Sequence, residues 1–228
     1  MDAAVRTGAG HSEPRADADT APAGAAVARR AGGAAATGFT PGRVGAGAGQ
    51  WVHAVATSLG PAEHDGEAVE YELVDLETFD LDLLNEPTKP SVAGREYENA
   101  KTRVWSEKID SIDGFVFVTP EYNHSISGSL KNALDFVATE FNHKVAGIVN
   151  YGADKGVRAA EHLRHILANY KVAVVRDQAS FSIFTDVTDG AFTPTEVSAA
   201  PFASMVDDLV AWGGALKGVR EGSEAVTV

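Results

Sequence analysis

Short apolar runs alternate with longer amphipathic segments along the chain from residue 40 onwards. Runs of β-branched and aromatic residues predict buried strands, and apolar residues at helical spacing predict helices. The predicted strands are 69–76, 115–119, 144–151 and 172–175. The predicted helices are 44–59, 97–109, 130–137, 157–170 and 195–216. Strands that alternate with helices predict a parallel sheet covered by helices on both faces, which is the α/β class.

One predicted loop carries more polar side chains than a connector needs. The strand at 115–119 is expected to end at Pro120, because proline has no N–H to donate to a sheet ladder. Ser125 or Ser127 can cap the helix that follows. The sequence Pro-Glu-Tyr-Asn-His-Ser therefore joins the carboxyl end of a strand to the amino end of a helix, where ligands bind in open α/β sheets. Position alone leaves a plain rigid turn as the alternative.

Composition narrows the class of protein. A length of 228 residues with 44% hydrophobic residues suits one large domain, or one domain with a tail. The sequence shows neither a run of eighteen apolar residues nor a secretory signal, so we expect no membrane partner. The absence of cysteine excludes disulfides and thiol nucleophiles and fits a cytoplasmic location. A net charge of −13 disfavours nucleic acid as a partner.

Residues 1–38 differ in composition from the rest of the chain. They contain fourteen Ala, six Gly and four Arg, and no Ile, Leu, Phe, Trp or Tyr. Such a segment buries too little apolar surface to offset the entropy of ordering the chain, so it is predicted to be disordered. We therefore expect a tail at 1–38, one domain at 39–217 and a flexible tail at 218–228.

The segment 120–137 carries a family resemblance, together with Thr-Pro-Gly-Arg at 40–43 and Tyr-Gly-Ala-Asp-Lys-Gly at 151–156. Over residues 40–217 the chain resembles the NADPH-dependent FMN reductase family of flavodoxin-like proteins. The resemblance implies a three-layer, doubly wound parallel sheet of five strands in the order 2-1-3-4-5, with FMN at its carboxyl edge. It also implies a homodimer or homotetramer.

The resemblance further implies an enzyme in which FMN is the cofactor and NADPH or NADH the co-substrate. Hydride would pass through the flavin to a small-molecule acceptor such as a quinone, free flavin, azo compound or metal oxyanion. Two alternatives remain open: a flavodoxin-like electron carrier or FMN-binding module without efficient NAD(P)H turnover, and a paralogue that no longer holds FMN.

Three loops would bind FMN according to the resemblance. The residues assigned to it are Thr40, Arg43, Pro120, Glu121, Tyr122, Asn123, Ser125, Gly152 and Asp154. Tyr122 offers a flat face, Asn123 offers a donor and an acceptor, and Arg43 can fork onto the phosphate. No catalytic acid or base is assigned, because the cofactor carries the chemistry. His162 and His165 have no evident third ligand, so we interpret them as solvated rather than metal-binding.

The chain departs from the family pattern in three places. Ser127 replaces a proline, Lys155-Gly156 replaces paired glycines, and Thr37 to Thr40 replaces Gly-Ser-Thr-Arg. In addition, the central first strand should be rich in Val, Ile or Leu, whereas residues 31–38 are mostly Ala and Gly, so this strand is atypical or missing. We hypothesise that residues 1–38 are not the native family beginning. The alternative is that 31–38 still fills the central position as a thin strand.

Overall fold

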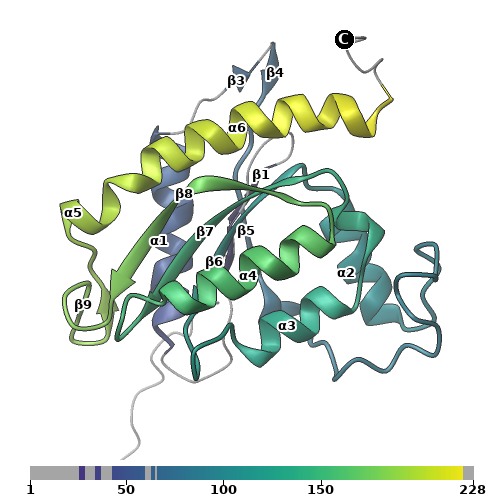
Figure 1. Ribbon diagram of the computed structural model, residues 1–228, viewed down its shortest axis with the longest axis horizontal. Helices are drawn as coiled ribbons and strands as arrows, with labels where there is room; N and C mark the ends of the chain where they lie inside the picture. Colours follow the sequence, from purple (N-terminus) through teal and green to yellow (C-terminus); the bar gives the residue numbers. More distant parts are fainter. Residues whose placement is uncertain (1–25, 29–33, 37–42, 60–62, 65, 223–228) are drawn as a thin grey trace, which may run out of the picture.

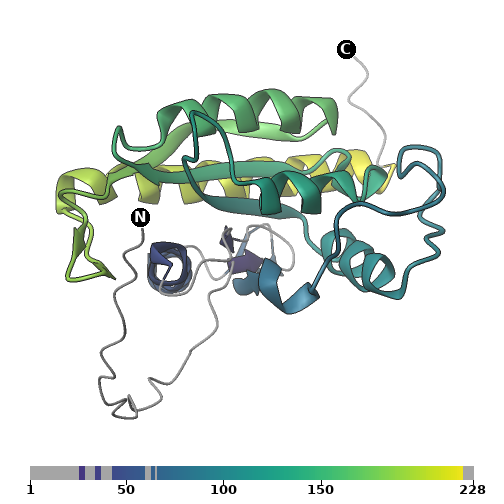
Figure 2. The same cartoon turned by 90° about the horizontal axis from the view of Figure 1, so that it is seen from below.

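The computed structural model describes residues 26–28, 34–36, 43–59, 63–64 and 66–222. A mostly parallel sheet with helices on both of its faces forms the body of the protein (Figures 1 and 2). The predicted α/β class is therefore confirmed. No helix in the described part of the chain is both long and apolar enough to cross a membrane.

Within the described residues, the main sheet has six strands in the order β1-β5-β2-β6-β7-β8. They are β1 (Ala26–Ala28), β2 (Ala34–Ala36), β5 (Glu72–Asp75), β6 (Gly114–Pro120), β7 (Val145–Gly152) and β8 (Ala173–Ser182). Two small hairpins join β3 (Glu63–His64) to β4 (Glu67–Ala68) and β9 (Val187–Thr188) to β10 (Ala191–Phe192). The helices are α1 (Val44–Leu59), α2 (Ala100–Asp110), α3 (Gly128–Asp135), α4 (Val157–Asn169), α5 (Glu196–Ala199) and α6 (Pro201–Arg220). Single 3₁₀ turns form η1 (Leu76–Phe79) and η2 (Thr139–Phe141).

Two short alanine-rich strands share the space between β5 and β6. β1 runs antiparallel to both neighbours and pairs with Gly114 and Phe115 of β6. β2 runs parallel to both and pairs with Val116 to Val118 of β6, further along the same strand. Backbone hydrogen bonds to two neighbours stabilise a strand whatever its side chains are. Residues 34–36 therefore lie in the central position, as the thin-strand interpretation expected.

The predicted boundaries need three corrections. Residues 26–28 and 34–36 lie in the sheet, although composition predicted disorder through residue 38. The sheet has six strands, so the five-strand order is not confirmed as stated. α6 continues to Arg220, beyond the predicted domain end at 217. The other predictions for residues 1–38 concern segments outside the described residues.

Two further elements differ from the hydrophobic pattern. β8 extends to Ser182, because the polar residues 176–178 that interrupted its apolar run lie on an edge strand and are not fully buried. The predicted helix 195–216 is two helices, because Pro201 begins α6 at a position where its missing N–H costs nothing.

Separate hydrophobic cores lie on the two faces of the sheet. α2, α3 and α4 cover one face, and α1 and α6 cover the other. On the second face, Trp51 of α1 packs against Phe181, Phe192 and Phe202. A Cβ at Gly47 would lie 3.1 Å from the Cβ of Phe192, so the glycines that weaken α1 as a helix let the β9–β10 hairpin approach it closely.

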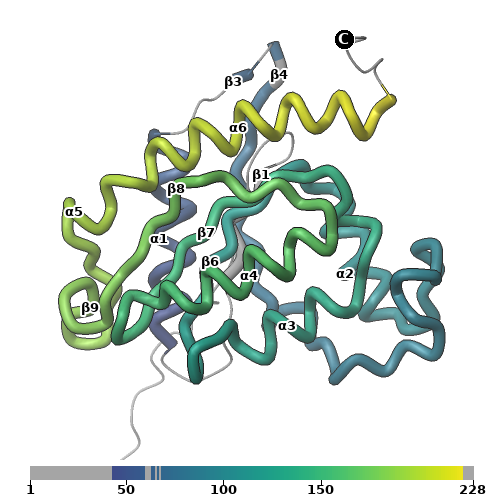
Figure 3. Tube along the Cα trace, viewed as in Figure 1, coloured from purple at the N-terminus to yellow at the C-terminus, as the bar shows by residue number. Residues whose placement is uncertain are grey.

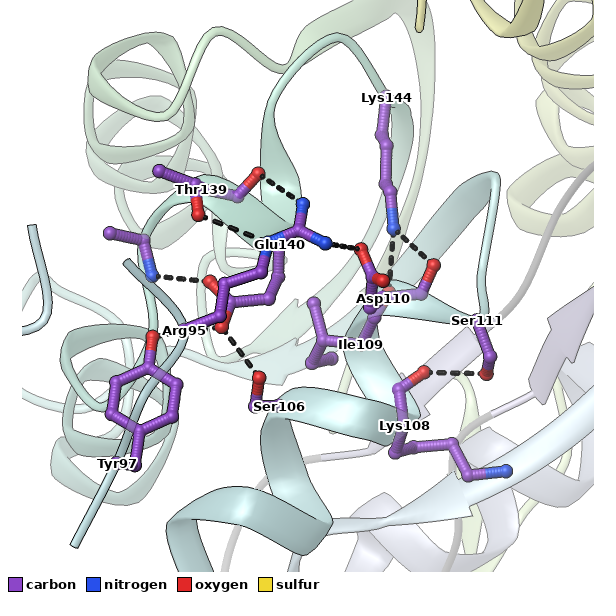
Figure 4. Close-up of polar contacts among 11 residues, drawn as sticks. Arg95, Tyr97, Ser106, Lys108, Ile109, Asp110, Ser111, Thr139, Glu140 and Lys144 are labelled. Carbon is purple, nitrogen blue, oxygen red and sulfur yellow. Dashed lines mark hydrogen bonds and ion pairs between the residues drawn. The ribbon is translucent and has the colours of Figure 1, made fainter. Parts of the chain in front are cut away.

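A buried polar cluster ties α2 to η2 at the amino edge of the sheet (Figure 4). The fully buried carboxylate of Glu140 accepts hydrogen bonds from Tyr97 Oη at 2.8 Å and Ser106 Oγ at 2.6 Å. Lys144, the residue before β7, donates its Nζ to the carbonyls of Ile109 at 2.7 Å and Asp110 at 3.0 Å. Lys144 thus caps the end of α2, where cations are favourable.

Lys144 should make the stability of the protein increase at alkaline pH. Burial lowers its pKa from 10.5 to about 8, Asp110 and Asp113 oppose this shift, and Arg220 and Arg95 add to it. Between pH 8 and pH 10.5, Lys144 is protonated in the unfolded chain and neutral in the folded chain. The free energy of unfolding attributable to Lys144 therefore rises from pH 8 to pH 10.5, by about 3 kcal/mol at most.

Urea unfolding of the wild type and of Lys144→Met across this pH range measures the effect. The difference between the two curves separates Lys144 from the tyrosines, which titrate in the same range in both proteins. We expect the variant to lack the alkaline rise, and parallel curves would contradict the prediction.

Candidate functional site

The loop after β6 is a tight two-residue hairpin. Tyr122 N donates to Ser125 O at 2.9 Å, and Ser125 N donates back to Tyr122 O at 3.0 Å. The two central residues, Asn123 and His124, have φ angles of 50° and 69°, as a type I′ turn requires. Asn123 is exposed and makes no side-chain hydrogen bond to the described residues. The hairpin therefore presents Tyr122 and Asn123 to solvent in a fixed conformation.

The loop after β7 is equally constrained. Lys155 N donates to Gly152 O at 3.2 Å, and the buried Asn150 donates its Nδ2 to Lys155 O at 2.7 Å. Ile183 N, at the end of β8, also donates to Gly152 O at 3.1 Å. Asn150 Oδ1 is buried without a hydrogen-bond partner in the described part of the chain. These contacts fix the path of the backbone between β7 and α4.

Glu121 joins the two loops. Its side chain is only 7% exposed, and its carboxylate accepts hydrogen bonds from Arg158 N at 3.1 Å and Ala159 N at 3.4 Å. Arg158 Nε donates to the same carboxylate at 2.6 Å, and the guanidinium also pairs with Asp154 at 2.9 Å. Gly156, the residue before α4, provides no side-chain cap, so Glu121 satisfies the first amides of this helix. The carboxylate is thus directed at α4, and contact with FMN stays a prediction for Glu121 and Asp154.

Arg43 lies at the start of α1 and is held by two carboxylates. Its Nη2 is 2.7 Å from Asp75 Oδ2 and 2.7 Å from Glu77 Oε2. Burial raises the pKa of Asp75, and the hydrogen bond from Arg43 opposes that shift. A phosphate on Arg43 would therefore share the guanidinium with Asp75 and Glu77.

The acidic partners of Arg43 differ from an ordinary surface loop. An acidic segment such as 75–86 is usually solvated, but Asp75 is buried and faces Arg43. Asp75 lies near the end of the predicted strand 69–76, which marks it as a residue of the carboxyl edge. In the fold, this end of β5 lies next to the start of α1.

The predicted site residues gather at the carboxyl edge of the sheet. Figure 3 shows the loops after β6 and β7 on the side of the molecule where α1 begins. Burial raises the pKa of Tyr151, the residue of β7 that pairs with Pro120 of β6 at this edge. Pro120 is the last residue of β6 and Gly152 is the last residue of β7, and these two strands are neighbours in the sheet. Thr40 lies outside the described residues.

His162 makes a contact with Ser125 that the sequence did not reveal. Its Nδ1 lies 3.1 Å from Ser125 Oγ, which links α4 to the hairpin after β6. His162 is exposed on α4, as its interpretation as a solvated residue expects. No group of three or more potential metal ligands occurs among the residues that the structure describes.

This edge suits a flat ring with polar atoms along its rim. Tyr122 is 44% exposed and offers an aromatic face, while the exposed carboxamide of Asn123 offers a donor and an acceptor. The second loop begins at Gly152 and ends at Gly156, and between them Ala153, Asp154 and Lys155 are exposed. These residues fit the isoalloxazine ring of FMN.

Comparison with known families identifies the chain. The sequence model of the NADPH-dependent FMN reductase family matches residues 25–186. The chain belongs to this family. The match includes β1 and β2, which precede the segment 40–217 that carried the resemblance. As a member of the NADPH-dependent FMN reductase family, the protein is an oxidoreductase with FMN as cofactor and NADPH or NADH as co-substrate, which confirms these three predictions.

Individual relatives support the family assignment. An NAD(P)H-dependent FMN reductase of Schizosaccharomyces pombe is 35% identical over 141 residues, which are 61% of this chain and 70% of the relative. A quinone reductase of Escherichia coli is 31% identical over 115 residues, which are 48% of this chain and 56% of the relative. An oxidoreductase structure from Corynebacterium diphtheriae aligns with a TM-score of 0.52 at 18% identity, covering 82% of this chain and 95% of that one. The last comparison supports the fold alone.

Proposed function

We propose that this FMN reductase passes electrons from NADPH or NADH through bound FMN to a small-molecule acceptor such as a quinone, free flavin, azo compound or metal oxyanion. The observation that carries the proposal is the rigid hairpin at the carboxyl edge, which presents Tyr122 and Asn123 to solvent next to the loop after β7. The name of the Escherichia coli relative, a quinone reductase, supports an acceptor of this class. We further propose a cytoplasmic homodimer or homotetramer that binds neither nucleic acid nor membranes.

The residues of the three loops would hold FMN in the following way. Tyr122 would lie along the ring on the rigid turn that Pro120 begins, and Asn123 and Ser125 would meet its polar atoms. The amides near Gly152 would approach the pyrimidine edge, and Arg43 with Thr40 would bind the phosphate. When bound, FMN supplies the two-electron chemistry, and the protein supplies position and charge.

A second candidate function is an FMN-binding or electron-carrier module without efficient NAD(P)H turnover. Two observations favour it: Gly-Ser-Thr-Arg is absent before Pro41, and two carboxylates already hold Arg43. Both features would loosen FMN at its phosphate end, which would lower the NAD(P)H turnover that the bound flavin can sustain, while leaving the ring end unchanged.

An absorbance spectrum of the purified protein under nitrogen separates these functions. A yellow protein that bleaches on addition of NADPH or NADH, and regains its colour with a quinone, supports the reductase. A yellow protein that keeps its colour supports the carrier. A colourless protein that takes up no added FMN contradicts both.

Asn123→Ala should weaken FMN binding by about 1–3 kcal/mol, because polar atoms of the ring lose a partner. The unfolding free energy of the protein without FMN should fall by about 1 kcal/mol at most, because alanine tolerates the left-handed φ of 50° less well than asparagine, while the carboxamide makes no hydrogen bond to the described residues. Fluorescence titration with FMN measures the first quantity and urea unfolding the second. Equal FMN affinity in the wild type and the variant would remove Asn123 from the site.

A further inference from the structure

Lys155 adopts a conformation that lysine rarely takes. Its φ is 60°, in the left-handed region, and the next residue, Gly156, has a φ of 76°. The side chain is exposed, and its ammonium makes no ion pair or hydrogen bond with the described residues. A non-glycine residue in this region is strained, because its Cβ approaches the following carbonyl oxygen, so glycine would be the expected residue here, as in the family pattern.

The surrounding structure enforces this conformation. Buried Asn150 holds the carbonyl of Lys155 at 2.7 Å, and the amide of Lys155 donates to Gly152 O at 3.2 Å. Strained backbone persists where neighbours fix it, and it concentrates at functional sites.

Lys171 provides an instructive contrast. Its φ is 56°, and it is also exposed, but it lies just after α4 at the opposite end of that helix. Left-handed residues are common at that position, where their amides bond to the last turn, and Lys171 N donates to Ala168 O at 3.1 Å. Lys155 precedes α4, so helix termination does not account for its conformation.

The charges around Lys155 indicate what the ammonium does. Glu121 and Asp154 are both bound to Arg158, which leaves this cluster with a net charge of −1. The chain as a whole carries −13. With the ammonium of Lys155 added, Glu121, Asp154 and Arg158 belong to a group with no net charge. This group lies at the edge of the sheet where Tyr122 and Gly152 lie.

We propose that Lys155 favours the reduced form of bound FMN over the oxidised form. This inference rests on the proposed function, in which FMN lies beside the Gly152 loop. A neutral flavin ring that accepts a hydride from NADPH, that is two electrons and one proton, gains one negative charge, and the nicotinamide leaves as NADP⁺. An ammonium beside the ring stabilises that added charge, and it offsets the −1 of the Glu121–Arg158–Asp154 cluster.

The experiment compares the wild type with Lys155→Gly, Lys155→Met and Lys171→Gly, each loaded with FMN and titrated anaerobically with dithionite against a reference dye. In both Lys155 variants, the affinity for reduced FMN divided by the affinity for oxidised FMN should fall about tenfold. This fall lowers the midpoint potential of the two-electron couple by about 30 mV. Lys171→Gly should leave the potential unchanged, because that end of α4 faces away from the site.

Thermal unfolding without FMN separates charge from backbone strain. Lys155→Gly and Lys171→Gly both relieve a left-handed lysine, so each should raise Tm by about 1–3 °C. Lys155→Met keeps the strain and should not raise Tm. The same fall in potential in the Gly and Met variants therefore assigns the effect to the charge.

Three results overturn the inference. An unchanged potential in both Lys155 variants, while the wild type is yellow and bleaches with NADPH, rejects the role of Lys155 and leaves the proposed function standing. A potential that falls in Lys155→Gly but not in Lys155→Met assigns the effect to loop conformation. A wild type that binds no FMN rejects both the inference and the proposed function.

Discussion

Gly156→Ala is expected to destabilise the protein by about 2–4 kcal/mol, because the new Cβ meets backbone atoms that cannot yield. It would lie 2.8 Å from the carbonyl oxygen of Tyr151 and 2.9 Å from its amide nitrogen. The φ of 76° adds the cost of a left-handed alanine. Urea unfolding of the protein without FMN measures the loss. Because the loop after β7 must shift, FMN binding should weaken as well.

Gly190→Ala is the matched control for this prediction. Gly190 also has a positive φ, of 80°, but nothing lies within 4 Å of the Cβ that the substitution would add. Its cost should therefore be that of the backbone conformation alone, about 1 kcal/mol. Equal losses in the two variants would show that contact with the Tyr151 backbone does not matter.

The second large effect is expected at Glu121. Glu121→Ala removes the acceptor of two α4 amides and one partner of Arg158, so it should destabilise the protein by about 2–4 kcal/mol. The loops after β6 and β7 would also lose their link. FMN affinity should then fall even if the carboxylate never contacts the flavin, since Tyr122 and Gly152 would no longer be held in register.

Asp154→Ala tests the opposite end of the same cluster. Asp154 pairs with Arg158 at 2.9 Å, but its side chain is 69% exposed, so the loss should stay below about 1 kcal/mol. Comparable losses in the Glu121 and Asp154 variants would contradict a special role for the buried carboxylate. Urea unfolding and an FMN titration of each variant provide the two measurements.

The sequence determined much of the framework of this family member. Alternation of apolar runs and amphipathic segments indicated the parallel sheet, because such patterns report which positions are buried and at what spacing. β6 ends at Pro120, as its missing N–H predicted, so the loop after that strand was placed correctly at the carboxyl edge, although its hairpin form was not predicted. The sequence alone also showed that Lys155-Gly156 stands where the family pattern has two glycines.

Only the tertiary structure decided how the site's charged side chains are used. Arg43 meets Asp75 from 32 positions away, and Glu121 meets the amide of Arg158 from 37 positions away. The polar pattern marks such residues only as hydrophilic, and their orientation depends on which loops the sheet brings together. The same holds for residues 26–28 and 34–36, because their alanines carry almost no side-chain signal and the backbone bonds of β5 and β6 place them in the sheet.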